Sequence, residues 1–190
     1  MSKYILASSN KSKLKEISHK LSSVELLSLE KLGYSDEIIE SGVTLEDNAF
    51  IKANTIYSHY NMSCISDDSG LEVYSLDNAP GVLSARYAGA EASSEDNIRK
   101  LLKEMQHISD RRARFRTVLC LISNTEKKFF EGIVEGCITT HRIGSNGFGY
   151  DSIFIPNGFQ KTFAQMSLNE KQQISHRSKA IDKLVQYLAI

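Results

Sequence analysis

The chain has 190 residues, a length that suits one domain, and 41% of them are hydrophobic, which is enough for a sizeable core. Lys plus Arg and Asp plus Glu both number 23, so the formal net charge is zero. This balance disfavours a nucleic-acid-binding module with a broad basic surface, although it leaves room for a local basic pocket.

The N-terminus and the cysteines indicate the compartment. The opening MSKYILASSNK has too short an apolar stretch for a signal peptide, and no apolar run approaches the roughly 18 residues of a membrane helix. The three cysteines, Cys64, Cys120 and Cys137, lie in apolar segments without Cys-x-x-Cys spacing, which is typical of free thiols in a reducing compartment. We therefore expect a cytoplasmic protein that makes no membrane contact.

The first part of the chain has a strand–helix–strand pattern. KYILAS (3–8) predicts a short buried strand, and KSKLKEISHKL (11–21) predicts a helix because its apolar residues recur at helical spacing. VELLSL (24–29) predicts the next strand, which completes a βαβ start.

An acidic pair follows a second helix. Residues 45–60 carry an apolar stripe at helical spacing, and CIS (64–66) and LEVYSL (71–76) each predict a strand. Between these strands lies Asp-Asp-Ser-Gly (67–70), which we read either as a turn that closes a hairpin or as a functional site.

The second half adds a long hairpin. A helix is expected from Ser94, its N-cap, to Gln106, and RFRTVLCLIS (114–123) and KFFEGIVEGCIT (128–139) predict two antiparallel strands. Together with the βα units, this hairpin predicts an α/β fold with a mixed sheet.

The C-terminal part combines a loop with helix signals. IGSNGFGYDS (143–152) predicts a glycine-rich loop, and Ser167 with Glu170 forms a capping box at a helix start. A last helix carries apolar residues from Ile181 to Leu188.

The loop SSNKSK joins the first strand to a helix N-terminus, where free backbone N–H groups attract anions. Ser8 and Ser9 offer hydroxyls, Asn10 an amide and Lys13 a positive charge, which suits a phosphate. The Walker pattern is absent, so an ordinary polar turn with a solvated lysine is the alternative.

The acidic pair suggests a cation. If a strand continues through Asp67 and Asp68, the two side chains point to opposite faces, and a buried carboxylate needs a partner. Hard oxygen ligands suit Mg²⁺ with substrate phosphates. One Asp would then hold the metal while the other orients or deprotonates water.

Three further signals are weaker one by one. Glu40 is a carboxylate beside apolar residues, and Lys52 on the second helix reads by itself as a surface lysine. FGYD (148–151) is suited to stacking on a planar ring, or else supplies core aromatics in a turn. The His–Arg pair in EKQQISHRSKA is usually a solvated face. Together with the phosphate loop and the acidic pair, these signals fit a nucleoside polyphosphate.

Five motifs in this order resemble the inosine/xanthosine triphosphate pyrophosphatase family over most of the chain. The motifs are LASSNKSK, ESGVTLEDNAFIKA, DDSGLEVYSLDNAPGVLSARYAG, GFGYDSIFIP and EKQQISHRSKA. The resemblance implies one domain over residues 1–190, with two lobes around a long mixed sheet with flanking helices and the active site in the cleft between the lobes. It also implies a homodimer that uses Mg²⁺ and hydrolyses ITP, dITP and XTP to the monophosphate and pyrophosphate. These nucleotides carry deaminated purine bases.

The resemblance also assigns site residues. Asp68 would be the catalytic base, Glu40 and Asp68 would hold the metal, and Asp67 would support the metal or its waters. The substrate would be bound by Ser8, Ser9, Asn10, Lys11, Ser12, Lys13, Lys52, Ser69, Phe148, Gly149, Tyr150, Asp151, Lys171, His176 and Arg177. Among these, Phe148 would stack on the purine, and Lys171, His176 and Arg177 would read it.

Two positions depart from the family pattern. Asp47 stands where Glu is usual, so its reach to a metal-bound water is shorter, and Ser9 stands where glycine is common. Two competing functions are a nucleotide sensor without catalysis, which would be expected to lack the carboxylates, and a related enzyme that prefers modified pyrimidine or methylated nucleotides.

Overall fold

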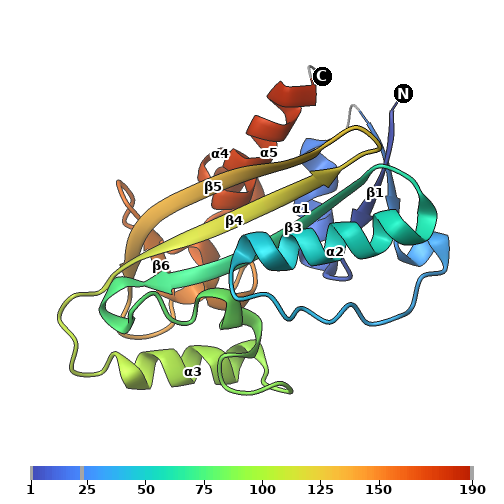
Figure 1. Ribbon diagram of the computed structural model, residues 1–190. Coiled ribbons are helices and arrows are strands. Elements are labelled where there is room, and N and C mark those ends of the chain that lie inside the picture. The colour runs from blue at the N-terminus through green and yellow to red at the C-terminus, as the bar shows by residue number, and fades with distance from the viewer. Residues whose placement is uncertain (1, 22–23, 189–190) are drawn as a thin grey trace. The chain divides into compact units, whose positions relative to one another are not determined.

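The computed structural model of the protein describes residues 2–21 and 24–188 (Figure 1). Its sheet has the strand order β2-β1-β3-β4-β5-β6. The strands are β1 (Lys3–Ala7), β2 (Glu25–Ser28), β3 (Cys64–Val73), β4 (Arg112–Ile122), β5 (Lys127–Ile138) and β6 (Phe154–Pro156). β1 pairs in parallel with β2 and β3, whereas β6 pairs antiparallel with β5. The predicted α/β fold with a mixed sheet is confirmed.

Helices flank this sheet. The α-helices of the described residues are α1 (Lys11–Lys20), α2 (Leu45–Tyr60), α3 (Ser94–Glu104), α4 (Leu168–Ile174) and α5 (His176–Leu188). Short 3-10 helices are η1 (Glu30–Leu32), η2 (Tyr74–Leu76), η3 (Gly81–Arg86), η4 (Gly149–Ile153) and η5 (Phe163–Gln165). In the ranges 2–21 and 24–188, no helix combines the length and the apolar character needed to cross a membrane.

The chain divides into two compact units. The first contains the described parts of Met1–Asp68, Thr117–Gly132 and Arg177–Ile190, and the second contains Ser69–Arg116 and Ile133–His176. That these units act as two lobes of one domain stays a prediction.

In the first unit, helices cover both faces of the sheet. Leu6 and Ile65 on the strands pack with Ile17 of α1 and Leu184 of α5 in one buried apolar cluster. On the other face lies α2, whose Ala49 carbonyl accepts a hydrogen bond from the Ser66 hydroxyl. Figure 1 shows α2 on one side of the strands and α1 and α5 on the other.

The second unit has its own core. Apolar residues of α3, the second half of β3, η4, β6 and η5 form one buried cluster, among them Leu101, Leu71, Ile153, Phe154 and Phe163.

β3 differs from the prediction. It is one continuous strand from Cys64 to Val73, not two strands around a turn at 67–70. At Gly70 the Gly81 carbonyl oxygen lies only 2.4 Å from the place of an added Cβ, so the backbone packed against the strand leaves no room for a side chain. Asp, Ser and Gly favour turns locally, but here pairing and close backbone packing overrule that preference.

The other expected elements lie within a few residues of their predicted bounds, and the α4 capping box of Ser167 and Glu170 is confirmed. All three cysteines are free, but Cys137 is exposed and not part of a core.

The N-cap of α3 is Ser93, not Ser94. The Ser93 hydroxyl accepts from the Asp96 N–H at 3.2 Å, and the Asp96 carboxylate accepts from the Ser93 N–H at 3.0 Å. The prediction was displaced by one residue because the two adjacent serines have the same capping chemistry.

We expect Ser93→Ala to lower the free energy of unfolding by about 1 kcal/mol, because it leaves the Asp96 N–H group without its acceptor. Ser94→Ala is the matched control and is expected to change it by less than about 0.5 kcal/mol. Urea unfolding of both variants measures the difference, and equal values would show that Ser93 is not the cap.

Candidate active site

Strand β3 gives the two neighbouring aspartates different partners. The Asp67 Oδ2 atom lies 3.1 Å from the Lys13 Nζ atom of α1 and 3.5 Å from the Arg177 Nε atom of α5. The Asp68 Oδ1 atom lies 3.3 Å from the Lys52 Nζ atom of α2. Alternation along the strand thus directs one carboxylate towards each face, as the sequence predicts for a continuous strand.

The loop before α1 gathers polar groups at a helix N-terminus. Asn10 caps the helix: its Oδ1 atom accepts from the backbone N–H groups of Ser12 at 3.0 Å and Lys13 at 3.2 Å. Ser9, Asn10, Lys11 and Ser12 are exposed, whereas Ser8 is buried. The cap orients the loop and uses only the Oδ1 atom of the Asn10 amide.

Lys52 is buried, so the interpretation as a surface lysine is wrong. It is 8% exposed, and its Nζ atom lies 3.0 Å from the Glu40 Oε1 atom and 3.3 Å from the Asp68 Oδ1 atom. A lysine is rarely buried without such partners. The ammonium therefore bridges the two carboxylates that the resemblance assigns to the metal.

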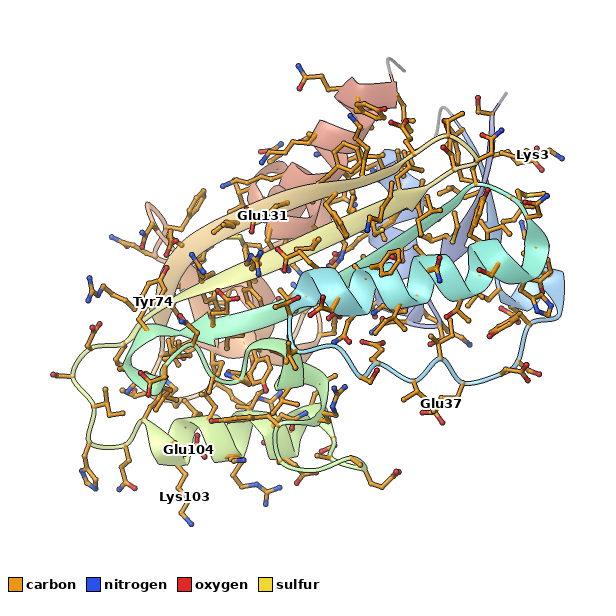
Figure 2. All side chains as sticks on the ribbon, in the orientation of Figure 1. Lys3, Glu37, Tyr74, Lys103, Glu104 and Glu131 are labelled. Carbon is orange, nitrogen blue, oxygen red and sulfur yellow. The ribbon has the colours of Figure 1, made fainter. Side chains whose placement is uncertain are left out.

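Glu40 lies on a segment without regular structure between η1 and α2, on which Figure 2 labels Glu37. This segment is fastened to α2 where the Gly42 N–H donates to the Asn48 Oδ1 atom at 2.8 Å. Asp47 is exposed, and its carboxylate accepts from the Thr44 N–H at 3.1 Å as part of the α2 capping box. Helix capping is thus the role that the structure shows for Asp47.

The pKa values of the two aspartates are shifted in opposite directions by their surroundings. Burial raises the pKa of Asp67, but Lys13, Arg177 and Lys52 outweigh it and hold that pKa at about 2. For Asp68 burial dominates over the nearby lysines, so its pKa is raised. Burial lowers the pKa of Lys52, yet Asp68, Asp67 and Glu40 more than offset this and raise it. Asp67 therefore stays ionised, and Asp68 is the better proton acceptor.

The residues around Asp68 fit a hard divalent cation. The Asp68 Oδ2 atom is buried without a hydrogen-bond partner, and Glu40 adds a second, partly exposed carboxylate. Over the described parts of the chain, no cluster of three or more His, Cys, Asp or Glu side chains could hold a metal ion. Two carboxylates plus water and substrate phosphates is the arrangement in which Mg²⁺ is commonly bound.

The second unit contains an aromatic and charged cluster. The Lys171 Nζ atom lies 2.8 Å from the Asp151 Oδ2 atom and 4.9 Å from the centre of the Phe148 ring. Asp151 also accepts from the Phe148 N–H at 2.8 Å. Gly147 has φ +76°, and a Cβ there would lie 2.1 Å from Asp151, so this turn requires glycine.

Tyr150 points into the core of the second unit. Its ring belongs to the buried apolar cluster, and its hydroxyl donates to the Ser84 carbonyl at 2.9 Å. The half-buried Phe148 and Gly149 and the buried Asp151 remain beside it, so the FGYD segment supplies both a core aromatic and an accessible one.

His176 and Arg177 do not form a solvated face, because they are 3% and 2% exposed. The His176 ring stacks on Phe115 in the second unit, with centroids 4.7 Å apart. Arg177 belongs to the first unit, where it pairs with Glu16 and Asp67. Ser69, the other predicted substrate residue, begins the second unit and is half-buried.

Two buried polar residues near the site were not predicted from the sequence. Glu16 lies on the buried face of α1 and pairs with Arg177, and Asn48 is fully buried and holds Gly42. A carboxylate next to Ile17, three positions after Lys13, was the available signal for Glu16, since those positions share a helix face.

A model of the Ham1 family matches residues 4–187. The chain belongs to the Ham1 family. It is 47% identical to the dITP/XTP pyrophosphatase of Christiangramia forsetii, over 98% of this chain and 99% of that protein. The dITP/XTP pyrophosphatase of Porphyromonas gingivalis is 46% identical, over 99% of this chain and 98% of that protein.

Solved structures agree with this membership. The Staphylococcus aureus Ham1 protein has a TM-score of 0.92 at 39% identity, covering 99% of this chain and 98% of that one. A nucleoside-triphosphatase, also named dITP/XTP pyrophosphatase, from Mycobacterium abscessus has a TM-score of 0.80 at 40% identity, covering 96% of this chain and 98% of that one. These family members share the fold of this chain over nearly its whole length.

The low pKa of Asp67 predicts acid sensitivity. Because the folded-state pKa of about 2 lies below the ordinary 3.8, the carboxylate stabilises the fold above about pH 4, and this contribution is lost as the pH falls towards 2. Its size is on the order of 2 kcal/mol, at about 1.4 kcal/mol per pKa unit. Asp67→Asn should therefore be less stable than the wild type at pH 7, with the gap narrowing below pH 4.

Urea unfolding at pH 7, 5 and 3 measures this gap. Asp182→Asn, an exposed substitution in the same unit, controls for the loss of a surface charge. A gap that does not change with pH would contradict the assigned pKa of Asp67.

Proposed function

We propose that this protein is a metal-dependent nucleoside triphosphate pyrophosphatase that hydrolyses dITP, ITP and XTP to the monophosphate and pyrophosphate. The observation that carries the proposal is that β3 directs the two aspartates to opposite faces. Asp67 pairs with Lys13, and Asp68 pairs with Lys52, which also contacts Glu40. The names of the relatives at 46–47% identity support the choice of substrates.

The first unit supplies the groups that the reaction needs at the phosphates. The α1 N-terminus, with Ser8 to Ser12, and the ammonium groups of Lys13 and Lys52 bind the triphosphate. Lys13 is anchored for this task by Asp67, which stays ionised. Negative charge that develops on the departing pyrophosphate is then met by fixed positive groups.

Asp68 is the proposed base. Its raised pKa makes it a better acceptor for a proton from the attacking water than an ordinary exposed aspartate. Glu40 and Asp68 would also hold the metal, for which we propose Mg²⁺ because the donors are carboxylate oxygens alone. When bound, such an ion would neutralise phosphate charge and polarise the scissile bond.

In this proposal the base is selected by residues of the second unit and by Arg177 of the first. Phe148 offers its ring for stacking, and Gly149, Tyr150 and Asp151 shape the wall beside it. Lys171, His176 and Arg177 read the base, and Ser69 contacts the substrate. Arg177 or His176 donates to the keto oxygen that hypoxanthine and xanthine carry and adenine lacks. Unmatched hydrogen-bonding groups would make adenine costly to accept. The proposal also includes that the enzyme is a homodimer and is located in the cytoplasm.

We expect Asp68→Asn to lower kcat for dITP by about 10²- to 10⁴-fold, because the variant loses the base. The fold should persist, since burial already disfavours the charged form of Asp68 and the amide has nearly the same shape. Pyrophosphate release measures turnover, and thermal unfolding checks the fold.

The exposed Asp182→Asn substitution is the control and should keep wild-type turnover. A folded Asp68→Asn variant with near-wild-type turnover would remove Asp68 from the chemistry.

A further inference from the structure

The Lys52 ammonium lies between the two carboxylates proposed for the metal. Its Nζ atom is 3.0 Å from Glu40 and 3.3 Å from Asp68. The side chains of Lys52 and Asp68 are each 10% exposed and that of Glu40 is 31% exposed, so little solvent screens the contact between Lys52 and Asp68. In the free protein, Lys52 is therefore a cation that both carboxylates share.

A divalent ion on the same carboxylates would meet a like charge at close range. Repulsion between cations a few ångströms apart is strong where water is scarce. Among the residues that the structure describes, no third carboxylate joins this pair to form a metal-holding group. Nearby Asp67 is committed to Lys13 and Arg177 on the opposite face of β3.

Of the side chains of Glu40, Asp68 and Lys52, that of Lys52 can change its position most easily. Asp68 is held by the continuous strand β3, and the segment carrying Glu40 is held through the hydrogen bond from Gly42 to the buried Asn48. Lys52 has a flexible four-carbon stem, and its helix α2 need not shift when the ammonium changes partners. The phosphates of a nucleotide offer that ammonium a new partner.

We propose that Lys52 is an exchangeable counter-ion that occupies the metal site of the free protein and leaves it for the phosphates of the bound nucleotide. Metal and nucleotide then bind cooperatively, and each raises the affinity for the other by the same factor. This inference rests on the proposed function only in taking a nucleoside triphosphate as the ligand that draws Lys52 away.

Lys13 provides a matched comparison. It is also a lysine in a salt bridge to an aspartate of β3, but its partner is Asp67 and its side chain is 15% exposed. Lys52→Met and Lys13→Met each remove one positive charge near the acidic pair and keep an unbranched side chain. Only Lys52→Met removes an ammonium group from between Glu40 and Asp68.

Calorimetric titration with Mg²⁺ alone tests the exchange. We expect Lys52→Met to bind Mg²⁺ more tightly than the wild type by about 5- to 150-fold, the usual range of coupling between two ligands. Lys13→Met should stay closer to the wild type than to Lys52→Met. If Lys52→Met binds Mg²⁺ no more tightly than the wild type, or if Lys13→Met gains as much, the proposal is overturned.

A second arm tests the cooperativity with an ITP analogue whose α,β-bridging oxygen is replaced by methylene. The analogue should raise the Mg²⁺ affinity of the wild type and raise that of Lys52→Met much less. An equal increase in both proteins would overturn the proposal. If Lys52→Met unfolds without metal, Lys52→Gln is used instead, and the increase of the unfolding temperature with Mg²⁺ concentration replaces the calorimetric titration. The Lys52 variant is again expected to bind Mg²⁺ more tightly than the wild type and Lys13→Met.

Hydrolysis of dITP by the wild type is measured separately. Active wild type with unchanged Mg²⁺ affinity in Lys52→Met would reject the exchange and leave the proposed function standing. Inactive wild type with tighter Mg²⁺ binding in Lys52→Met would reject the function and leave the exchange standing.

Discussion

The alternation of side chains along one buried strand is the constraint on which the candidate site depends. Ile65 and Asp67 face α1 and α5, while Ser66 and Asp68 face α2. Two adjacent carboxylates are therefore paired with different cations on opposite faces of β3, although the charges on each face still influence the other. The pKa of Asp67 is lowered and that of Asp68 is raised, although the residues are chemically identical.

Burying two carboxylates obliges the fold to bring cations to them from distant parts of the chain. Removing one partner of a buried ion pair typically costs about 3–5 kcal/mol, so each face needs its own positive group. α1 supplies Lys13, α5 supplies Arg177 and α2 supplies Lys52. In the proposed function Lys13 and Lys52 also bind the triphosphate, so fold stability and substrate binding would draw on the same two charges.

The sequence predicted the elements well where hydrophobic periodicity dominates, as in α2, which spans the expected 45–60. It failed at β3, because Asp-Asp-Ser-Gly has the composition of a turn and only its packing partners make it a strand. Strand alternation still predicted opposite faces for the two aspartates once continuity was assumed. The alternation of side chains along a strand therefore predicted the orientation of the two aspartates, although the strand itself was not predicted there.

Partners distant in the sequence lay beyond such rules. Nothing local reveals that Lys52 is buried against Glu40, or that Arg177 pairs with Glu16 about 160 positions away. Family resemblance supplied the candidate residues, and the coordinates supplied their groupings. Arg177, for example, lies with the carboxylates of the first unit, whereas Lys171 lies with Phe148 and Asp151 in the second.

The most direct test of the account identifies the products formed from dITP in oxygen-18 water by mass spectrometry. We expect the deoxynucleoside monophosphate and pyrophosphate in equal amounts, with one oxygen-18 atom incorporated per turnover, and little product from dATP under the same conditions. Release of orthophosphate with the deoxynucleoside diphosphate, or equal turnover of dATP, would contradict it.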